Sequence, residues 1–420
     1  MKKHLLVILA VITTFLIQAL NLNSLYGEES LFSPRLVSFP FVQKMFSFVE
    51  KNKAKIIEEW IYLTEIPAPS GHEERRAEYL AKEFKSAGLD KVYIDPFGNV
   101  IGIWKGKARD KNIILSAHMD TVFQGVWKIK VKREDNLLKA PGIGDDTANL
   151  INMLWSLRAL KQAGFEPTHT YYFMGTVGEE VGLVGMKNFL EQTTENFDIL
   201  LALDGDLGKV HYGALGFAGG KVFFRGPGAH TMQSRGVPDP NLAVAKTIER
   251  IYALELPSKP VDKWTILNVG QMGGGRVRNA VSQESFFTLD LRSADQGELE
   301  RTQAEVKRIC TEVASEVGVE FEIELDETAK AYQLPGRKNS FLVKTAVEIL
   351  EFLKVRDIEV DPLGSTEANT GLEKGILSLN LGRTYGRYKH SLREEAEIEG
   401  LFLALKQILL MICSLEWNYK

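Results

Sequence analysis

Cysteine is scarce in this sequence. Cys310 and Cys413 are the only cysteines among 420 residues, and they lie far apart along the chain. Two such residues cannot build the disulfide framework of a small secreted domain, so the fold must be stabilised by its apolar core. We expect both residues to be buried thiols.

An excess of basic charge is also lacking. Lys and Arg together number 51 against 55 for Asp and Glu, which leaves a formal net charge of −4. Proteins that bind nucleic acid neutralise its phosphates with a concentrated basic surface, so no nucleic acid is expected as a partner. The remaining composition, 45% hydrophobic and 25% charged, is that of an ordinary globular chain with about two or three domains.

The N-terminal segment differs from the rest of the chain. Lys2, Lys3 and His4 precede an uncharged apolar run over residues 5–20, and this pattern is typical of a signal peptide, here residues 1–27. The run is shorter than the roughly 20 residues that span a membrane. No clean pair of small residues marks a cleavage site, so a cleaved signal peptide and an uncleaved N-terminal membrane anchor both stay open. Either one predicts an exported protein that is periplasmic, secreted or membrane-anchored.

Periodic apolar segments predict an α/β domain interrupted by a smaller domain. Helical patterns cover the segments 70–88, 150–164, 341–353 and 394–413, and they alternate with compact apolar runs typical of buried strands at 92–94, 100–104, 112–117, 171–176, 199–203 and 377–381. This alternation predicts a mixed sheet sandwiched by helices, formed by residues 45–214 and 329–420. Residues 215–328 between them follow the order strand, helix, strand, strand, helix, strand, which suits an inserted α+β domain.

Acidic and imidazole side chains gather where the predicted strands end. Imidazole nitrogen and carboxylate oxygen hold divalent metals, and such ligands are usually found in the loops after strands. Because buried carboxylates repel one another unless a cation lies among them, the convergence of so many acids predicts a metal site. The candidates are His118, Asp120, Asp145, Asp146, Glu179, Glu180, Asp204 and His390.

With these motifs, SAHMDT, PGIGDDTANL, MGTVGEE, ALDGD and GRYKHS, the sequence resembles a known family. It is similar to the dinuclear zinc peptidases and amidohydrolases that include glutamate carboxypeptidase, peptidase T, the aminoacylases and succinyl-diaminopimelate desuccinylase. The resemblance spans nearly all of the chain from about Val49 onward, and the motifs occur in the family's order. It implies a zinc-exopeptidase-like catalytic domain with an inserted lid and dimerisation domain.

The resemblance also implies a role for each candidate in the catalytic domain. Two Zn²⁺ per chain are expected, with Co²⁺ or Mn²⁺ as substitutes. Asp145 bridges the two ions in this scheme; Glu180 and His390 complete one site, and His118 and Asp204 complete the other. Asp120 orients the ring of His118 from behind. Glu179 acts as the general base toward a water held between the ions.

The inserted domain carries three further candidates. By the same resemblance, His230 in the turn GPGAHT reaches the oxyanion of the reaction, across the interface of a homodimer formed through the lid domain. Asn279 and Arg292 match positions associated with substrate binding. For Arg292, a structural ion pair at a strand end explains the residue equally well as a contact with a substrate carboxylate.

Two departures from the family pattern affect substrate choice. The loop before His390 is unusually basic, and Glu367 stands where many members carry Asp. The sequence therefore predicts a hydrolase that cleaves a peptide bond of short peptides at or near a terminus, with an N-acyl amino-acid amidohydrolase as the alternative. An inactive binding protein of the same fold would show the loss of a ligand or of the base, and none is lost.

Overall fold

The computed structural model describes residues 29–108 and 110–417, and it divides them into two compact units. The first unit contains the described residues up to Tyr212 and those from Leu334 onward; the second is Gly213–Gln333. Each unit is considered by itself. The segment 1–27, predicted to be a signal peptide or anchor, lies outside the described residues.

The first unit is built on an eight-stranded mixed sheet in the order β1-β2-β6-β3-β7-β19-β8-β18. The neighbours β6, β3, β7 and β19 are parallel, so their carboxyl ends meet at one edge. These strands are buried along nearly their whole length, which explains their uninterrupted apolar sequences. The bounds are β1 (Lys91–Ile94), β2 (Val100–Trp104), β3 (Asn112–His118), β6 (Thr170–Thr176), β7 (Ile199–Leu203), β8 (Lys209–His211), β18 (Glu359–Asp361) and β19 (Leu377–Leu381).

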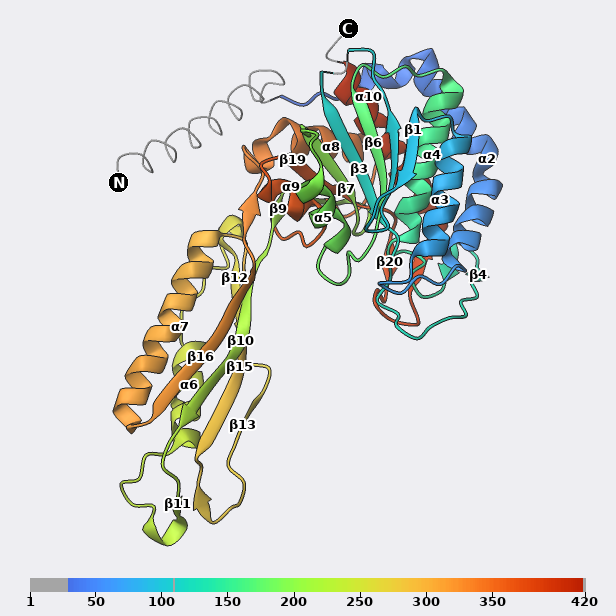
Figure 1. Cartoon of the computed structure of the whole chain (residues 1–420). Coiled ribbons are helices and arrows are strands. Elements are labelled where there is room, and N and C mark those ends of the chain that lie inside the picture. Colours follow the sequence, from blue (N-terminus) through green and yellow to red (C-terminus); the bar gives the residue numbers. More distant parts are fainter. Residues whose placement is uncertain (1–28, 109, 418–420) are drawn as a thin grey trace. The chain divides into compact units, whose positions relative to one another are not determined.

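Helices cover both faces of this sheet, as the sequence predicts (Figure 1). On one face, α5 (Val184–Gln192) and α9 (Ala368–Glu373) contribute Met186, Phe189 and Ala368 to a hydrophobic cluster that also contains Tyr172 and Met174 of β6. On the other, α4 (Thr147–Ala163) contacts β3 and also packs against α2 (Pro40–Thr64) and α10 (Ile398–Trp417). The helices α3 (Glu74–Ser86) and α8 (Phe341–Phe352) cover the two ends of the sheet, against β1 and β2 and against β8 and β19 respectively.

Some predicted boundaries differ from the structure. The last helix begins at Ile398 rather than at residue 394, because residues 395–397 form strand β21 (Glu395–Glu397) and the side chain of Glu394 binds a distant loop. The helix α2 is absent from the sequence prediction. Its signals are Pro40 at the first position and buried apolar residues such as Met45, Val49 and Trp60 at helical spacing.

A small antiparallel sheet lies beside the main one in the first unit. Its order is β20-β21-β5-β4, with β4 (Lys132–Glu134), β5 (Leu137–Lys139) and β20 (Gly386–Arg387). Register pairs Ala396 of β21 with Leu138 of β5. The sheet thus joins the segment before α4 to the segment before α10.

The second unit is a five-stranded antiparallel sheet with two helices packed on it. The sheet has the order β12-β15-β10-β16, and β13 also pairs with β15. The helices α6 (Pro240–Tyr252) and α7 (Gln296–Val317) bury Val244, Val306 and Cys310 against Phe224 and Phe287 of the sheet. The main strands are β10 (Gly216–Arg225), β12 (Thr265–Asn268), β13 (Met272–Gly274), β15 (Glu284–Ser293) and β16 (Glu320–Ala329); short pairs are β9 (Gly213–Ala214) with β17 (Tyr332–Gln333) and β11 (Ala229–His230) with β14 (Ala280–Val281).

One helix among the described residues is long and apolar enough to cross a membrane. It is the segment Ile398–Glu416 of α10, and 83% of its apolar stretch is buried inside the fold. Contacts with α4, α8 and α2 account for that burial. This segment is therefore a core helix of the first unit.

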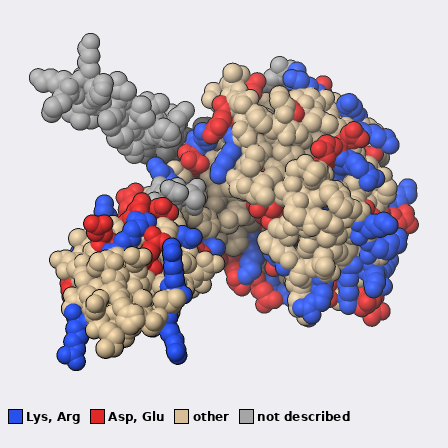
Figure 2. Space-filling view, turned by 60° about the horizontal axis from the view of Figure 1, so that its bottom comes forward, with Lys and Arg blue, Asp and Glu red and all other residues tan. Residues whose placement is uncertain are grey.

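The mixed surface charge and the buried cysteines agree with what the composition predicts. On the face drawn in Figure 2, Lys and Arg side chains are interspersed with Asp and Glu. Both Cys310 and Cys413 are buried, and burial raises the pKa of the Cys310 thiol to about 12. The cysteines therefore belong to the apolar core.

Candidate metal centre

The parallel strands bring the predicted ligands to one edge of the sheet. His118 is the last residue of β3, Asp204 directly follows β7, and Glu179 and Glu180 lie in the loop after β6. Because β6, β3 and β7 are parallel neighbours, the residues after them converge. Asp145 reaches the same place from the loop that enters α4.

The loop around Asp145 requires a glycine. Gly142 has φ +70°, and a Cβ atom there would lie 2.7 Å from Cγ2 of Thr121. The hydroxyl of Thr147 donates to the carbonyl oxygen of Gly142, which closes the loop onto the first turn of α4. The side chain of Asp145 is thereby held at the N-terminal end of that helix.

Two groups of metal-binding side chains form in the described residues, and they share Asp145. One group is His118, Asp145, Asp146 and Asp204; the other is Asp145, Glu180 and His390, with the donor atoms of each group within 4.8 Å of one another. Oδ1 of Asp145 lies 3.2 Å from Nε2 of His118, and Oδ2 lies 3.3 Å from Nε2 of His390. The two oxygens of one carboxylate therefore face two different histidines.

The donor set fits two divalent ions. Imidazole nitrogen and carboxylate oxygen are the ligands of zinc and of similar borderline metals. Oε1 of Glu180 is buried without a hydrogen-bond partner among the described residues, while its Oε2 lies 3.3 Å from Nε2 of His390. Burial opposes the ionisation of Asp145, yet the charges of Arg383 and His118 hold its pKa well below the usual range. Asp145 is thus an anionic ligand.

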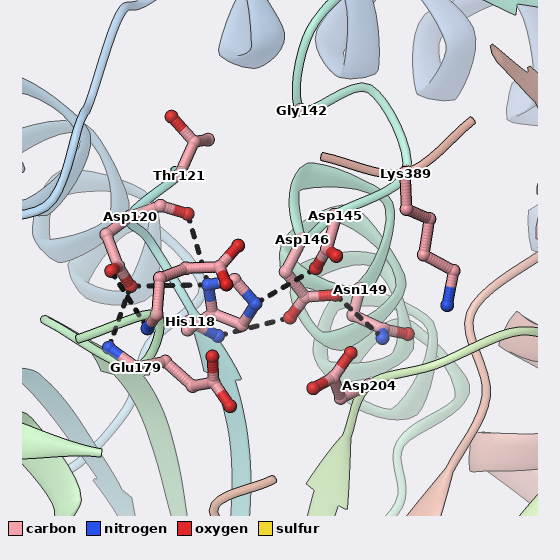
Figure 3. A network of polar contacts seen from close by, with 12 residues as sticks. His118, Asp120, Thr121, Gly142, Asp145, Asp146, Asn149, Glu179, Asp204 and Lys389 are labelled. Atoms are coloured by element: carbon pink, nitrogen blue, oxygen red, sulfur yellow. Dashed lines mark hydrogen bonds and ion pairs between the residues drawn. The ribbon is translucent and has the colours of Figure 1, made fainter. Parts of the chain in front are cut away.

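Asp120 connects the His118 strand to the two glutamates. Its Oδ1 lies 3.3 Å from Nδ1 of His118, the ring nitrogen that faces away from Asp145. The same carboxylate accepts hydrogen bonds from the backbone N–H groups of Glu179 at 3.0 Å and Glu180 at 3.2 Å, and from the hydroxyl of Ser70 at 2.7 Å. One side chain therefore orients the imidazole and fixes the loop after β6 (Figure 3).

Glu179 points into the space between the metal-binding side chains. In Figure 3 its carboxylate lies beside the ring of His118, on the side that faces Asp204. Burial raises the pKa of Glu179 well above its ordinary value, and the nearby charges of Asp204, Glu180 and Asp145 raise it further, against the effect of His118. A buried carboxyl group of raised pKa beside a metal site is suited to accept and release a proton.

Three further residues belong to this centre: Asp146, a sequence candidate that was given no role, and Arg383 and Glu394, which the sequence prediction did not include. Asp146 accepts the backbone N–H of His118 at 3.1 Å. Arg383, just after β19, reaches Asp145 and Asp204 with Nη1. Glu394 accepts hydrogen bonds from the backbone N–H groups of Gly142, Gly144 and Asp145, and burial raises its pKa to about 7. Arg383 follows a strand as the ligands do, whereas no sequence pattern marks Glu394.

The candidates of the second unit lie at its surface. His230 and Asn279 are both exposed, on the neighbouring short strand β11 and the residue before β14, with Nδ2 of Asn279 3.5 Å from Nε2 of His230. Nδ1 of His230 accepts the backbone N–H of Met232 at 3.2 Å. This bond orients the ring so that Nε2 stays on the side of Asn279.

Arg292 forms an ion pair within its own strand. Its Nη2 lies 3.0 Å from Oδ2 of Asp290, and the guanidinium lies over the ring of Phe217 at 4.9 Å from the centroid. Both charged side chains are about half exposed, with 46% and 49% of their surface accessible. The ion pair with Asp290 and the contact with Phe217 are therefore the structural role that could explain Arg292 without a substrate.

Two segments of the chain match described protein families. Residues 99–230 match Peptidase family M28, and residues 212–318 match the peptidase dimerisation domain. The first match contains His118, Asp145, Glu180 and Asp204, and the second covers most of the second unit. The first unit is therefore similar in part to Peptidase family M28, and the second to the peptidase dimerisation domain.

Three proteins are similar to this chain over almost their whole length. The uncharacterized protein YqjE of Bacillus subtilis is 28% identical over 376 residues, which are 86% of this chain and 98% of that protein. The crystal structure of aminopeptidase PepT from Bacillus cereus superimposes with a TM-score of 0.76 and 25% identity, covering 88% of this chain and 99% of that one. A tripeptidase structure from Staphylococcus aureus gives a TM-score of 0.74 at 24% identity, covering 86% and 98% of the two chains.

The two units differ in what they carry. The first unit contains both groups of metal-binding side chains, and most of the second matches a peptidase dimerisation domain. The chain is therefore a metallohydrolase whose centre is assembled from strand ends of the first unit.

Proposed function

We propose that this metallohydrolase uses two zinc ions to cleave a peptide bond of short peptides at or near a terminus. The observation that carries the proposal is the position of Asp145, whose two carboxylate oxygens face His118 and His390 separately. A carboxylate in that position suits a bridge between two ions. Similarity at 25% identity to aminopeptidase PepT supports a terminal peptide bond as the target.

The side chains divide the work of hydrolysis. When bound, two zinc ions supply a water whose pKa is lowered to about 7 and polarise the scissile carbonyl group. Glu179 takes the proton of that water on its carboxylate and returns it to the nitrogen of the leaving amine as the C–N bond breaks. The carboxylate of Asp120 accepts the backbone N–H of Glu179 and so keeps Glu179 in place. The same carboxylate orients the ring of His118.

We further propose that the enzyme acts as a homodimer through its second unit. The match of residues 212–318 to a peptidase dimerisation domain supports this assembly. His230 then serves as a hydrogen-bond donor to the oxyanion that develops on the substrate carbonyl, a role for which its exposed ring is accessible. Asn279, which contacts that ring, is assigned to substrate binding beside it.

A substrate panel tests the proposal directly. Enzyme loaded with zinc is offered dipeptides, tripeptides and the same amino acids carrying an N-acyl group, and each product is quantified. We expect turnover of the short peptides with a free terminus. Preference for N-acyl amino acids would assign the same centre to an amidohydrolase instead. Chelation should abolish turnover, and zinc, cobalt or manganese should restore it.

Export is a separate proposal that rests on residues 1–27. Their charged start and apolar run are the pattern of a signal peptide or anchor. Fractionation of cells that express the whole chain tests it, with N-terminal sequencing of the product to distinguish cleavage from anchoring. Recovery of the uncut chain from the soluble cytoplasmic fraction would contradict export.

A further inference from the structure

A guanidinium group is buried inside one of the two groups of metal-binding side chains. Arg383 is only 1% exposed, and its Nη1 lies 2.6 Å from Oδ1 of Asp204, 3.2 Å from Oδ1 of Asp145 and 3.4 Å from Oδ1 of Asp146. These three carboxylates belong to the group that contains His118. Arg383 was not anticipated as part of the centre, and the function proposed above does not use it.

The other group has no such cation. Within the described part of the chain, Oδ2 of Asp145 and Oε2 of Glu180 form ion pairs with the ring of His390, and no Lys or Arg ion pair reaches those two oxygens. Asp145 therefore presents one oxygen to a site that already holds a permanent positive charge and the other to a site that does not. The two prospective ion sites are electrostatically unequal.

A resident guanidinium affects a metal ion in two ways. Arginine stays protonated at every relevant pH, and in a buried place its repulsion of a dication is weakly screened. It also occupies the same carboxylate oxygens, Oδ1 of Asp145 and Oδ1 of Asp204, that an ion beside His118 would need. Nη2 of Arg383 has no hydrogen-bond partner among the described residues, so the group is not fully engaged by the chain.

We propose that Arg383 is a resident cation that lowers the affinity of the His118–Asp145–Asp204 site for its ion. The two ions then bind with unequal affinities, and the His118 site fills only at the higher metal concentration. The occupancy of the complete two-ion centre becomes sensitive to the free zinc concentration. This inference rests on the two-ion centre proposed above.

The test isolates the affected site and then removes the cation. In His390→Ala the second group loses a ligand, and zinc titration against a chelating indicator reports the remaining site. Adding Arg383→Met should tighten zinc binding there by about tenfold or more, within the range by which groups around metal ligands alter affinity. Arg387→Met is the matched control, because Arg387 lies four residues further along, in β20, with 75% of its side chain exposed, and it should leave the affinity unchanged.

A second measurement keeps the test decisive if the Met variant folds poorly without metal. Removing Arg383 leaves two buried carboxylates and one partly buried carboxylate without their shared cation, so the metal-free variant should unfold at a lower temperature than wild type. Saturating zinc should then raise its unfolding temperature by more than it raises that of wild type. Arg383→Lys keeps a charge and should resemble wild type in both measurements.

The outcomes separate this inference from the proposed function. If wild type binds two zinc ions and Arg383→Met leaves the affinity in the His390→Ala background unchanged or weaker, Arg383 only orients its carboxylates and the inference is wrong. If wild type takes up fewer than two ions even in excess zinc, the two-ion function itself fails. Titration of wild type over a wide range of zinc is therefore measured first.

Discussion

The candidate residues of the two units differ in how they are held. In the first unit, Asp120, Asp146 and Glu179 are buried, and each carboxylate or its backbone has hydrogen-bond partners that fix it. In the second, His230 and Asn279 are exposed, and the contact between their side chains spans 3.5 Å. Apart from His390, whose side chain is 55% exposed, the first set is buried or partly buried within its own unit, whereas the second set lies at the surface.

Burial determines how much the structure says about the functional role of a polar side chain. Buried carboxylates cost free energy unless a cation pairs with them, so their presence in a core demands an explanation such as a metal. An exposed histidine costs almost nothing to keep and thus carries little evidence of its role.

The same substitution at the adjacent residues Glu179 and Glu180 should impair the enzyme in different ways. Glu179→Gln keeps size and hydrogen bonding but cannot accept a proton, so kcat should fall by about 10² to 10⁴ with both ions retained. Glu180→Gln should instead lose metal, with activity partly rescued by excess zinc. Zinc per chain and kcat are measured for both enzymes. Loss of metal in Glu179→Gln with retention in Glu180→Gln would mean that the two roles are reversed.

His230→Ala tests whether the exposed set is functional at all. If His230 stabilises the oxyanion, kcat should fall by about 10² or more while zinc content stays at the wild-type level. Mixed dimers of Glu179→Gln and His230→Ala chains should recover some activity if His230 acts on the partner's centre. Normal turnover of His230→Ala would reduce this residue to a turn position.

Glu367 is a buried acid of the first unit that belongs to neither group of metal-binding side chains. It is 3% exposed, and burial raises its pKa from 4.5 to about 7. The folded state therefore favours the protonated form, and stability should be lost as pH rises from about 4.5 through about 7. The shift corresponds to roughly 3 kcal/mol. Urea unfolding of metal-free enzyme across this range should show a smaller loss in Glu367→Gln, whereas parallel curves for the two proteins would contradict the raised pKa.

Arg292→Ala should have the smallest effect. The pair with Asp290 is about half exposed, and such pairs contribute about 0.2 to 1 kcal/mol or less. We expect a change in unfolding free energy of about 0.5 kcal/mol and nearly unchanged kcat/KM. A large rise in KM for substrates with a free carboxylate, at unchanged stability, would show that Arg292 binds substrate.

Much of the fold could be predicted because its signals are local. The compact apolar runs of β3, β6, β7 and β19 predict buried strands, and the polar residues after them predict that a site forms where these strands end. The structure confirms the predicted fold class, a mixed sheet sandwiched by helices with an inserted α+β domain. The pairing of the ligands into two groups, however, came from the family resemblance rather than from spacing.

The part that sequence reasoning missed depends on contacts between distant segments. Glu394 was assigned to a helix because it precedes the long apolar run of α10, yet its carboxylate binds three backbone N–H groups near Asp145. Arg383 resembled one more basic residue of a basic loop. Only the folded chain shows that its guanidinium lies among Asp145, Asp146 and Asp204. Such long-range polar contacts leave no periodic trace in the sequence.

The position of the metal centre along the chain has a consequence for biosynthesis. Most of its side chains, from His118 to Asp204, are made before the second unit, whereas Arg383, His390 and Glu394 are made after it. A ribosome that has completed the second unit has therefore produced most of the acid cluster without its guanidinium, its second histidine or the carboxylate that holds Gly142. The enzyme cannot assemble its centre until the last part of the chain has emerged, which delays hydrolytic competence until synthesis is almost complete.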